Sequence, residues 1–343
     1  MDDLTHGPEP PEPVLNRIPE PPAPPPEPEH GIHWIFVGKS GMIRAGWGIL
    51  IFIVVFAAEY WGLKHLFQHR HTGSEALPPL AGLISESLGL LCVIIATGIV
   101  ALIERKSLLA YGYQGRARGA RFLFGFVWGF VAISALVFAL WKLGYLAFDG
   151  QMLHGSAMIN YAAAWGLMFL IVALVEESLL RGYLQFTSTR GIGFWWGALL
   201  FSFLFGLGHS TNPGESPVGL FSAGAVGLVW CLSIWYTGSL YWAVGFHAAW
   251  DWGESYFYGT GDSGNVVQGH LYGTHPLGNI LWSGGKTGPE GSILIVPLLI
   301  VMAILMWLWW GRRVESPFKG QGWRPAWMRK PQVIENEGLQ KAA

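Results

Sequence analysis

The sequence predicts an all-α fold, a polytopic membrane bundle of about eight transmembrane helices. Hydrophobic residues make up 52% of the 343 residues and charged residues 13%, whereas about a quarter of a typical soluble domain is charged. The 19 Trp and 47 Gly agree with this, since Trp gathers at membrane interfaces and Gly is more frequent in membrane helices than in soluble ones. The net charge of −1, without a broad basic stripe, argues against a nucleic-acid partner.

Eight apolar segments match, or nearly match, the length of about 20 residues that crosses a hydrocarbon core of about 30 Å. We expect transmembrane helices at residues 42–63, 77–103, 121–148, 160–186, 193–210, 218–236, 239–258 and 292–310. Short turns and polar residues blur the limits of the fifth, sixth and seventh. Together these segments define a predicted transmembrane domain at residues 31–315.

The two ends of the chain differ in composition from this domain. Residues 1–30 hold eleven of the 21 prolines, interleaved with glutamates, and are expected to form an extended, disordered cytoplasmic tail. This stretch lacks the pattern of a secretory signal peptide, so the first helix is expected to act as an uncleaved anchor. Residues 316–343 are expected to form a basic cytoplasmic tail.

Positive charge in short loops marks the cytoplasmic side of a membrane protein. Residues 105–121 hold five Lys or Arg, and residues 312–330 hold six. With eight spans, both segments and both termini lie in the cytoplasm. The outer loops are then residues 64–76, 150–159, 211–217 and 259–291. We expect the chain in the cytoplasmic membrane of a bacterium, with the lipid bilayer and a membrane-associated peptide or protein substrate as its partners.

Two adjacent carboxylates and an arginine interrupt the fourth apolar segment. A charge at mid-membrane costs about 2.5 to 3.5 kcal/mol on insertion scales, so the presence of two adjacent carboxylates requires a structural or functional explanation. Glu177 and Arg181 are four apart, hence on one face of a helix, where they can pair. Glu176 lies about 100° around the helix from Glu177, so its side chain points away from the face that holds Glu177 and Arg181. The alternative is that both glutamates lie near the cytoplasmic end of the span and only snorkel or pair.

Two further polar motifs follow on later segments. Phe205 and His209 are four apart at the end of the fifth segment, where a lone histidine is as readily an interfacial residue as a ligand. His247 and Asp251 are four apart on the seventh, where a carboxylate can orient an imidazole or bind a metal beside it. A helix-stabilising pair is the alternative for His247 and Asp251. It leaves unexplained why three separate helices carry such residues.

Glu176, His209, His247 and Asp251 together supply the nitrogen and oxygen ligands that zinc sites use. The set also includes a carboxylate able to act as general base toward a bound water. The single-helix His-Glu-x-x-His arrangement of soluble metalloproteases is missing. A site built from several helices is therefore expected, with Zn²⁺ as a candidate cofactor and a metal-independent site as the alternative.

The three motifs occur in a characteristic order. They are Glu-Glu-x-x-x-Arg at residues 176–181, Phe-x-x-x-His at 205–209 and His-x-x-x-Asp at 247–251. In order and spacing they resemble, over residues 160–258, the signature of the family that joins type II CAAX prenyl endopeptidases with bacteriocin-processing and immunity proteins. The resemblance implies an intramembrane endopeptidase that hydrolyses a peptide bond of a membrane-associated substrate, for which a prenylated C-terminus is a candidate.

The resemblance also implies a role for each matched residue. Glu176 would activate water with support from Glu177 and Arg181, and His209 would act on the same water directly or through a metal. His247 and the residue four later would stabilise the oxyanion. That residue is Asp251, where the eukaryotic prenyl proteases carry Asn. Because an ionised carboxylate donates no hydrogen bond, Asp251 either binds a metal, is protonated, or orients His247.

Two other functions are compatible with intramembrane polar residues. A non-enzymatic immunity or scaffold protein that retains the fold would depend on its loops or tails rather than on Glu176. A transporter would use Glu and His as a proton relay, but neither paired interrupted helices nor an inverted repeat is evident.

Depth in the bilayer poses a difficulty for the distributed site. Glu176 is expected about 15 Å from the cytoplasmic end of its span, and His209 about 25 Å if its helix starts at Gly193.

Overall fold

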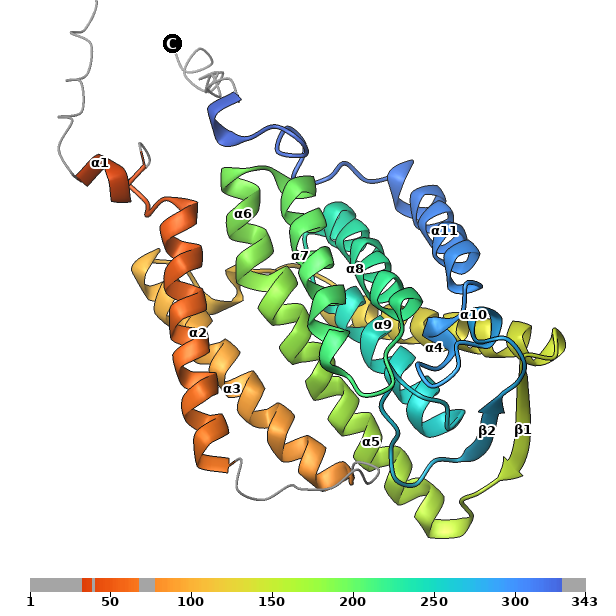
Figure 1. The fold of residues 1–343 in the computed structure, drawn as a ribbon. Helices are drawn as coiled ribbons and strands as arrows, with labels where there is room; N and C mark the ends of the chain where they lie inside the picture. The colour runs from red at the N-terminus through yellow and green to blue at the C-terminus, as the bar shows by residue number, and fades with distance from the viewer. Residues whose placement is uncertain (1–32, 39–40, 68–77, 329–343) are drawn as a thin grey trace, which may run out of the picture.

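The computed structural model describes residues 33–38, 41–67 and 78–328. The tail predicted at residues 1–30 lies outside the described residues, as does the end of the basic tail, residues 329–343. The described chain is a helical bundle with one two-stranded sheet, shown in Figure 1. This confirms the predicted class, a predominantly helical membrane bundle.

The elements of the first half lead to one long helical run. In order they are α1 (His33–Phe36), α2 (Ala45–Phe67), α3 (Pro79–Ile103), η2 (Leu108–Ala110), α4 (Arg118–Lys142), β1 (Leu146–Gln151), α5 (Gly155–Glu176), η3 (Glu177–Leu184) and α6 (Gln185–Gly191). The second half consists of α7 (Phe194–Gly208), η4 (His209–Thr211), α8 (Pro217–Thr237), α9 (Tyr241–Asp251), η5 (Trp252–Phe257), β2 (Tyr272–Pro276), α10 (Ile280–Ser283), η6 (Pro289–Gly291), α11 (Ile295–Met306), η7 (Trp307–Gly311) and η8 (Ala326–Met328).

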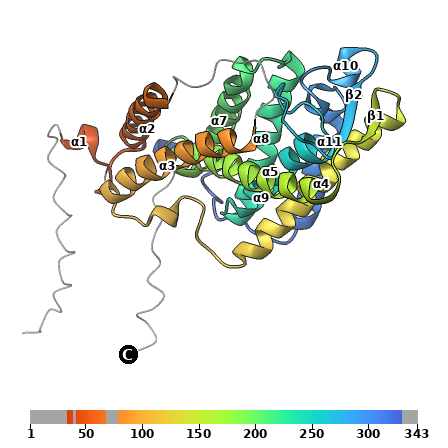
Figure 2. The same cartoon turned by 90° about the horizontal axis from the view of Figure 1, so that it is seen from below.

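Helix α9 lies at the centre of the bundle, and every residue from Trp242 to Asp251 is buried. It packs against α4 and α5, while α7 packs against α8 and α11 packs against α8. Helices α2 and α3 pack against each other and form one edge of the bundle, which lies at the left in Figure 1 and also in the turned view of Figure 2. A polar side chain on α9 is therefore enclosed by protein.

Glycines allow α4 and α9 to approach closely. A Cβ at Gly125 or Gly129 of α4 would lie 2.1 or 2.2 Å from the carbonyl oxygens of Trp242 and Phe246. Gly245 of α9 meets the backbone of α4 in the same way. Small residues four apart bring membrane helices into backbone contact. This contact fixes the position of α9 next to α4.

The third helix and the sheet differ from the sequence prediction. The helix predicted at residues 121–148 ends at Lys142, and Leu146 begins a strand that pairs antiparallel with β2, inside the predicted outer loop 259–291. Gly144 has a φ of 79° and stops the helix, as a left-handed glycine after a C-terminus commonly does. The prediction of a helix through Phe148 was wrong. The apolar residues at the start of β1 have the same high hydropathy as those of α4, so hydropathy alone does not show where the helix ends.

Among the described residues, five helices are long and apolar enough to cross a membrane. They are Ala45–Leu63, Pro79–Ile103, Arg118–Lys142, Gly155–Gly191 and Pro217–Thr237. Helix α7 has 15 residues and α9 has 11, and the apolar run Ile295–Gly311 is also short. The count of eight spans stays a prediction. Helix α1 and the end of the described chain lie at the same end of the bundle in Figure 1.

In the structure, Glu176 and His209 lie equally many residues from the turn between Gly155–Gly191 and α7, whereas the sequence predicted different distances from the cytoplasmic end. The run Gly155–Gly191 continues past the predicted end of its span, so Glu176 lies 15 residues before its last residue. His209 lies 15 residues after Phe194, the first residue of α7. At about 1.5 Å per residue, both side chains lie about 22 Å from the turn that joins the two helices.

A buried carboxylate directly after α3 joins several elements. Glu104 accepts hydrogen bonds from the hydroxyls of Tyr111 and Tyr183 at 3.1 and 2.9 Å and forms ion pairs with Lys106 and Arg190. Burial acts to raise the pKa of Glu104, but Arg190, Lys106 and Tyr183 outweigh it and hold that pKa below its usual value. The carboxylate therefore ties the end of α3 to η3 and α6.

Glu104→Gln is expected to lower the free energy of unfolding by about 2 kcal/mol, because two cations lose a buried partner. Since the folded pKa of Glu104 is lowered, its contribution is present above the unfolded pKa of about 4.3 and is lost as pH falls through the folded value. Melting temperatures of the full chain in detergent at neutral and acidic pH measure this difference. Glu315→Gln, which removes an exposed pair with Lys319, is the matched control and should leave the melting temperature unchanged. Equal shifts in the two variants would contradict the proposed role of Glu104.

Candidate active site

The two adjacent glutamates lie where α5 passes into the π-helical segment η3. Helix α5 ends at Glu176 and η3 begins at Glu177. Gly182, with φ −80° and ψ −117°, kinks the run within η3. Such π-helical turns are frequent at functional sites. The Glu176 side chain is 31% exposed and that of Glu177 is fully buried, so the two carboxylates occupy different environments.

Glu177 and Arg181 form the pair that their spacing predicts. Arg181 Nη1 donates to Glu177 Oε1 at 3.2 Å, and neither side chain is exposed. The guanidinium carbon lies 4.3 Å from the ring centre of Phe205 on α7 and 5.2 Å from that of Trp230 on α8. Aromatic faces attract a cation, and here they help to compensate a buried charge that is otherwise costly.

A glycine of α8 provides the space for the arginine. A Cβ at Gly227 would lie 2.0 Å from Arg181 Nη2 and 3.1 Å from Ser202 Oγ. Three residues further along α8, Trp230 contacts the same guanidinium. Gly227 and Trp230 were not predicted as site residues, because neither residue type stands out in an apolar segment rich in Trp and Gly.

His247 of α9 lies among three carboxylates. Its Nδ1 is 3.2 Å from Glu177 Oε1, and its Nε2 is 3.5 Å from Glu176 Oε2 and 3.4 Å from Asp251 Oδ2. Trp230 stacks on the imidazole with the ring centres 4.3 Å apart. Both ring nitrogens face acceptors, an arrangement that only the doubly protonated imidazolium satisfies in full.

His209 lies in the single turn η4 directly after α7 and is half-buried. Its Nδ1 is 2.8 Å from the carbonyl oxygen of Phe205, so Nδ1 carries a proton as donor and Nε2 of the neutral ring keeps its lone pair. The Phe205 ring contacts both imidazoles, with ring centres 4.7 Å from His209 and 6.0 Å from His247. His209 is therefore a proton acceptor beside the group around His247.

The structure brings the predicted site residues together. Direct contacts join Arg181, Glu177, His247, Glu176 and Asp251 in one group. His209 adjoins this group through the Phe205 ring. The three motifs thus meet across α5, η3, η4 and α9.

Among the described residues, the predicted zinc ligands Glu176, His209, His247 and Asp251 do not form a set whose ligand atoms all lie within 4.8 Å of one another. In the part of the chain that the structure describes, a different set of acidic side chains has its ligand atoms within 4.8 Å of one another. A zinc ion needs three or four ligands at about 2.0 to 2.3 Å. Zinc coordination by these residues therefore stays a prediction.

Two acidic residues of the predicted outer loop 259–291 lie near the group and were missed from sequence. Asp262 and Glu290 are within electrostatic range of Asp251. Burial and the charge of Glu290 raise the pKa of Asp262 to about 7. Both residues lie far along the chain from any motif, in a Gly-rich loop, so no spacing rule connects them to the site.

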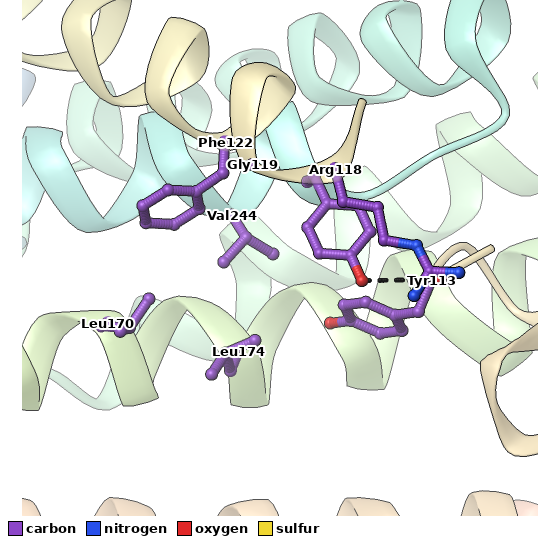
Figure 3. A pocket seen from close by; sticks show the side chains of 8 residues that line it. Tyr113, Arg118, Gly119, Phe122, Leu170, Leu174 and Val244 are labelled. Atoms are coloured by element: carbon purple, nitrogen blue, oxygen red, sulfur yellow. Dashed lines mark hydrogen bonds between the residues drawn. The ribbon is translucent and has the colours of Figure 1, made fainter. Parts of the chain in front are cut away.

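A cavity of about 300 Å³ lies between α4, α5 and α9, and Figure 3 shows it from close by. Its lining residues are Tyr113, Arg118, Gly119, Phe122, Leu170, Leu174, Tyr241 and Val244. The Tyr113 hydroxyl hydrogen-bonds to Ser178 Oγ, next in the chain to Glu177. One residue that lines the cavity is thus hydrogen-bonded to the neighbour of Glu177 in the chain.

Comparison with known families agrees with this geometry. Residues 158–253 match the family of type II CAAX prenyl endopeptidases described as Rce1-like. The match extends from α5 to η5, includes all three motifs, and confirms the resemblance that the motifs indicate. No curated protein sequence matches the chain. The matched family indicates a protease-type activity in a membrane.

Proposed function

We propose that the chain is an intramembrane endopeptidase of the CAAX prenyl type, which cleaves a membrane-associated substrate with water activated by Glu176 and His209. The observation that supports it best is the contact of His247 with both Glu176 and Glu177, since this contact gathers motifs from different helices of the matched region. We propose that Glu176 and His209 activate the water without a metal.

Glu176 is suited to act as general base. Its side chain is 31% exposed and contacts His247 through Oε2, so Oε1 is free to accept a proton from water. The water oxygen then attacks the scissile carbonyl carbon, while Nε2 of His209 accepts a hydrogen bond from the same water. When the C–N bond breaks, the proton passes to the leaving amine.

His247 is suited to stabilise the oxyanion. In the free site its Nε2 lies 3.5 Å from Glu176 Oε2 and 3.4 Å from Asp251 Oδ2, and an oxyanion that forms nearby would accept a hydrogen bond from Nε2–H. Glu177 holds the opposite nitrogen and is itself held by Arg181. In this proposal Asp251 orients His247 by accepting a hydrogen bond, instead of donating one to the oxyanion as Asn would.

The apolar cavity of Figure 3 is the proposed entry for the substrate. Its walls suit a lipid-modified C-terminal peptide better than a soluble one. We also propose that both termini lie in the cytoplasm of a bacterium, and the basic residues between α3 and α4 and after η7 support this orientation.

His209→Ala is expected to slow cleavage at least about 100-fold, because a positioned proton acceptor is lost. The rate is measured with a farnesylated peptide ending in Cys-aliphatic-aliphatic-X and the full chain in liposomes. Wild-type protein treated with the transition-metal chelator 1,10-phenanthroline should keep its rate. Asp149→Asn, which changes an exposed carboxylate paired with His275, is the control and should also keep its rate.

Two outcomes would count against these assignments. Unchanged cleavage by His209→Ala would remove this residue from the mechanism. Loss of wild-type activity on chelation, restored by Zn²⁺, would establish a metalloprotease instead.

A further inference from the structure

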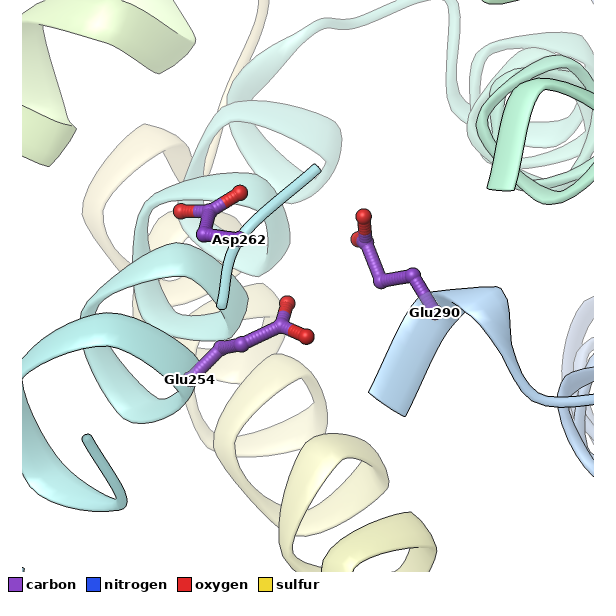
Figure 4. A group of neighbouring side chains, drawn as sticks. All are labelled: Glu254, Asp262 and Glu290. Atoms are coloured by element: carbon purple, nitrogen blue, oxygen red, sulfur yellow. The ribbon is translucent and has the colours of Figure 1, made fainter. Parts of the chain in front are cut away.

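Three carboxylates from separate segments meet beside the proposed active site. Glu254 belongs to η5, Asp262 to the loop after it and Glu290 to η6. One carboxylate oxygen of each lies within 4.8 Å of the others. Figure 4 shows the three side chains directed toward one another. All three lie beyond the family match at residues 158–253.

Hydrogen bonds orient two of the three carboxylates. Ser255 Oγ donates to Asp262 Oδ2 at 2.9 Å. Trp250 Nε1 donates to Glu290 Oε1 at 2.7 Å, and Ser263 Oγ donates to Glu290 Oε2 at 2.8 Å. An ionised carboxylate has about four lone-pair sites, so each keeps acceptor capacity for another group.

Glu254 differs from the other two because no donor orients its carboxylate. It is completely buried, and neither of its carboxylate oxygens has a hydrogen-bond partner. None of the ion pairs found among the described residues includes Glu254, Asp262 or Glu290. A buried ionised carboxylate without a donor is strongly unfavourable, so protons or a cation must compensate the charge here.

A backbone carbonyl lies close to Glu254. A Cβ at Gly288 would lie 2.0 Å from the carbonyl oxygen of Gly261 and 3.2 Å from Glu254 Oε1. Gly288 has a φ of 100°, which L side chains rarely adopt. A side chain at this position would meet both the Gly261 carbonyl and the Glu254 carboxylate, and hard cations take both kinds of oxygen as ligands.

We propose that Glu254, Asp262 and Glu290 bind one hard divalent cation, with Ca²⁺ as the preferred ion. The three side chains offer only oxygen, which suits hard cations rather than the softer metals that thiolate and imidazole sites select. Ca²⁺ takes six to eight oxygens at about 2.3 to 2.6 Å, so oxygens on opposite sides of it lie about 4.6 to 5.2 Å apart. The three ligand atoms, which lie within 4.8 Å of one another, are close enough for one ion of this size to contact them all. Mg²⁺ requires shorter, octahedral contacts at about 2.0 to 2.1 Å.

The cation would hold the segment after η5 against the end of α9. Trp250, which donates to Glu290, directly precedes Asp251, and Glu254 follows Asp251 by three residues. A bound ion would therefore connect η5, the following loop and η6, next to the last turn of α9 that carries His247 and Asp251. This role concerns stability and positioning, and it does not depend on the proposed peptidase activity.

Calorimetric Ca²⁺ binding and thermal unfolding of the full chain in detergent test this site. After treatment with EDTA and its removal, wild-type protein is expected to bind one Ca²⁺. At a hundredfold excess of Ca²⁺ over its dissociation constant, the melting temperature should rise by about 5 °C. Glu254→Gln and Asp262→Asn should each lose binding and the shift, whereas Asp149→Asn should keep both.

Asp262→Asn is the safer of the two variants because Asp262 is only half-buried, so it keeps the test valid if Glu254→Gln fails to fold. The proposal is overturned if stripped wild-type protein binds none of Ca²⁺, Mg²⁺ and Mn²⁺, since protons then compensate the charge. Binding of Zn²⁺ alone, or Ca²⁺ binding that persists in both variants, would also overturn it.

Discussion

Glu176→Gln is expected to lower the rate of peptide cleavage by at least about 1000-fold while the protein stays folded, because the amide cannot accept a proton from water. The side chain is partly exposed, and its contact with His247 is long, at 3.5 Å. An isosteric replacement therefore leaves the buried pair of Glu177 and Arg181 in place. Cleavage kinetics in liposomes and the melting temperature in detergent measure the two effects separately.

Glu177→Gln is the matched comparison for this variant. It makes the same chemical change one residue away, but Glu177 is fully buried and contacts both Arg181 and His247. We expect this variant to lower the melting temperature as well as the rate, because Arg181 keeps a buried charge without its partner. If Glu176→Gln kept its activity while a stable Glu177→Gln lost it, the general base would be Glu177 instead.

Gly227→Ala is expected to reduce both activity and stability. The new Cβ would lie 2.0 Å from Arg181 Nη2, so the guanidinium must move away from Glu177 and the aromatic rings around it. Overpacking of this kind costs about 1 to 3 kcal/mol. Displacement of Glu177 also releases His247, and a misplaced catalytic group can cost about 100-fold in rate.

Gly98→Ala in α3 is the control for this prediction. It adds the same methyl group to a helical glycine, but nothing lies within 4 Å of the new atom. We expect wild-type activity and an unchanged or slightly higher melting temperature, since alanine has the higher helix propensity. A Gly227→Ala variant that behaved like Gly98→Ala would contradict the buried position of Arg181.

Much of the candidate site is predictable because charged residues stand out in apolar helices. The pair of Glu177 and Arg181, and the contact of His247 with Asp251, follow from a spacing of four residues on a helix. The contact of His247 with Glu177 does not, because it depends on how α5 and α9 pack. That packing is set by tertiary contacts, such as those of the α4 glycines, which leave no simple pattern in the sequence.

Helix ends were less predictable than helix positions. The run Gly155–Gly191 extends past residue 186 through buried polar residues that lower the hydropathy of this segment. Ser188 and Thr189 donate their hydroxyl protons to the carbonyl oxygen of Gln185, so they are satisfied inside the helix. Because the sequence alone does not show such hydrogen bonds, the end of this helix was predicted five residues too early.

Mass spectrometry of peptide products tests the proposed endopeptidase most directly. The full chain in liposomes is incubated with farnesylated and unmodified peptides that end in Cys-aliphatic-aliphatic-X. We predict one cut, after the farnesylated cysteine, with wild-type protein and none with Glu176→Gln. Intact peptides in the presence of folded wild-type protein, or the same products from Glu176→Gln, would contradict the proposal.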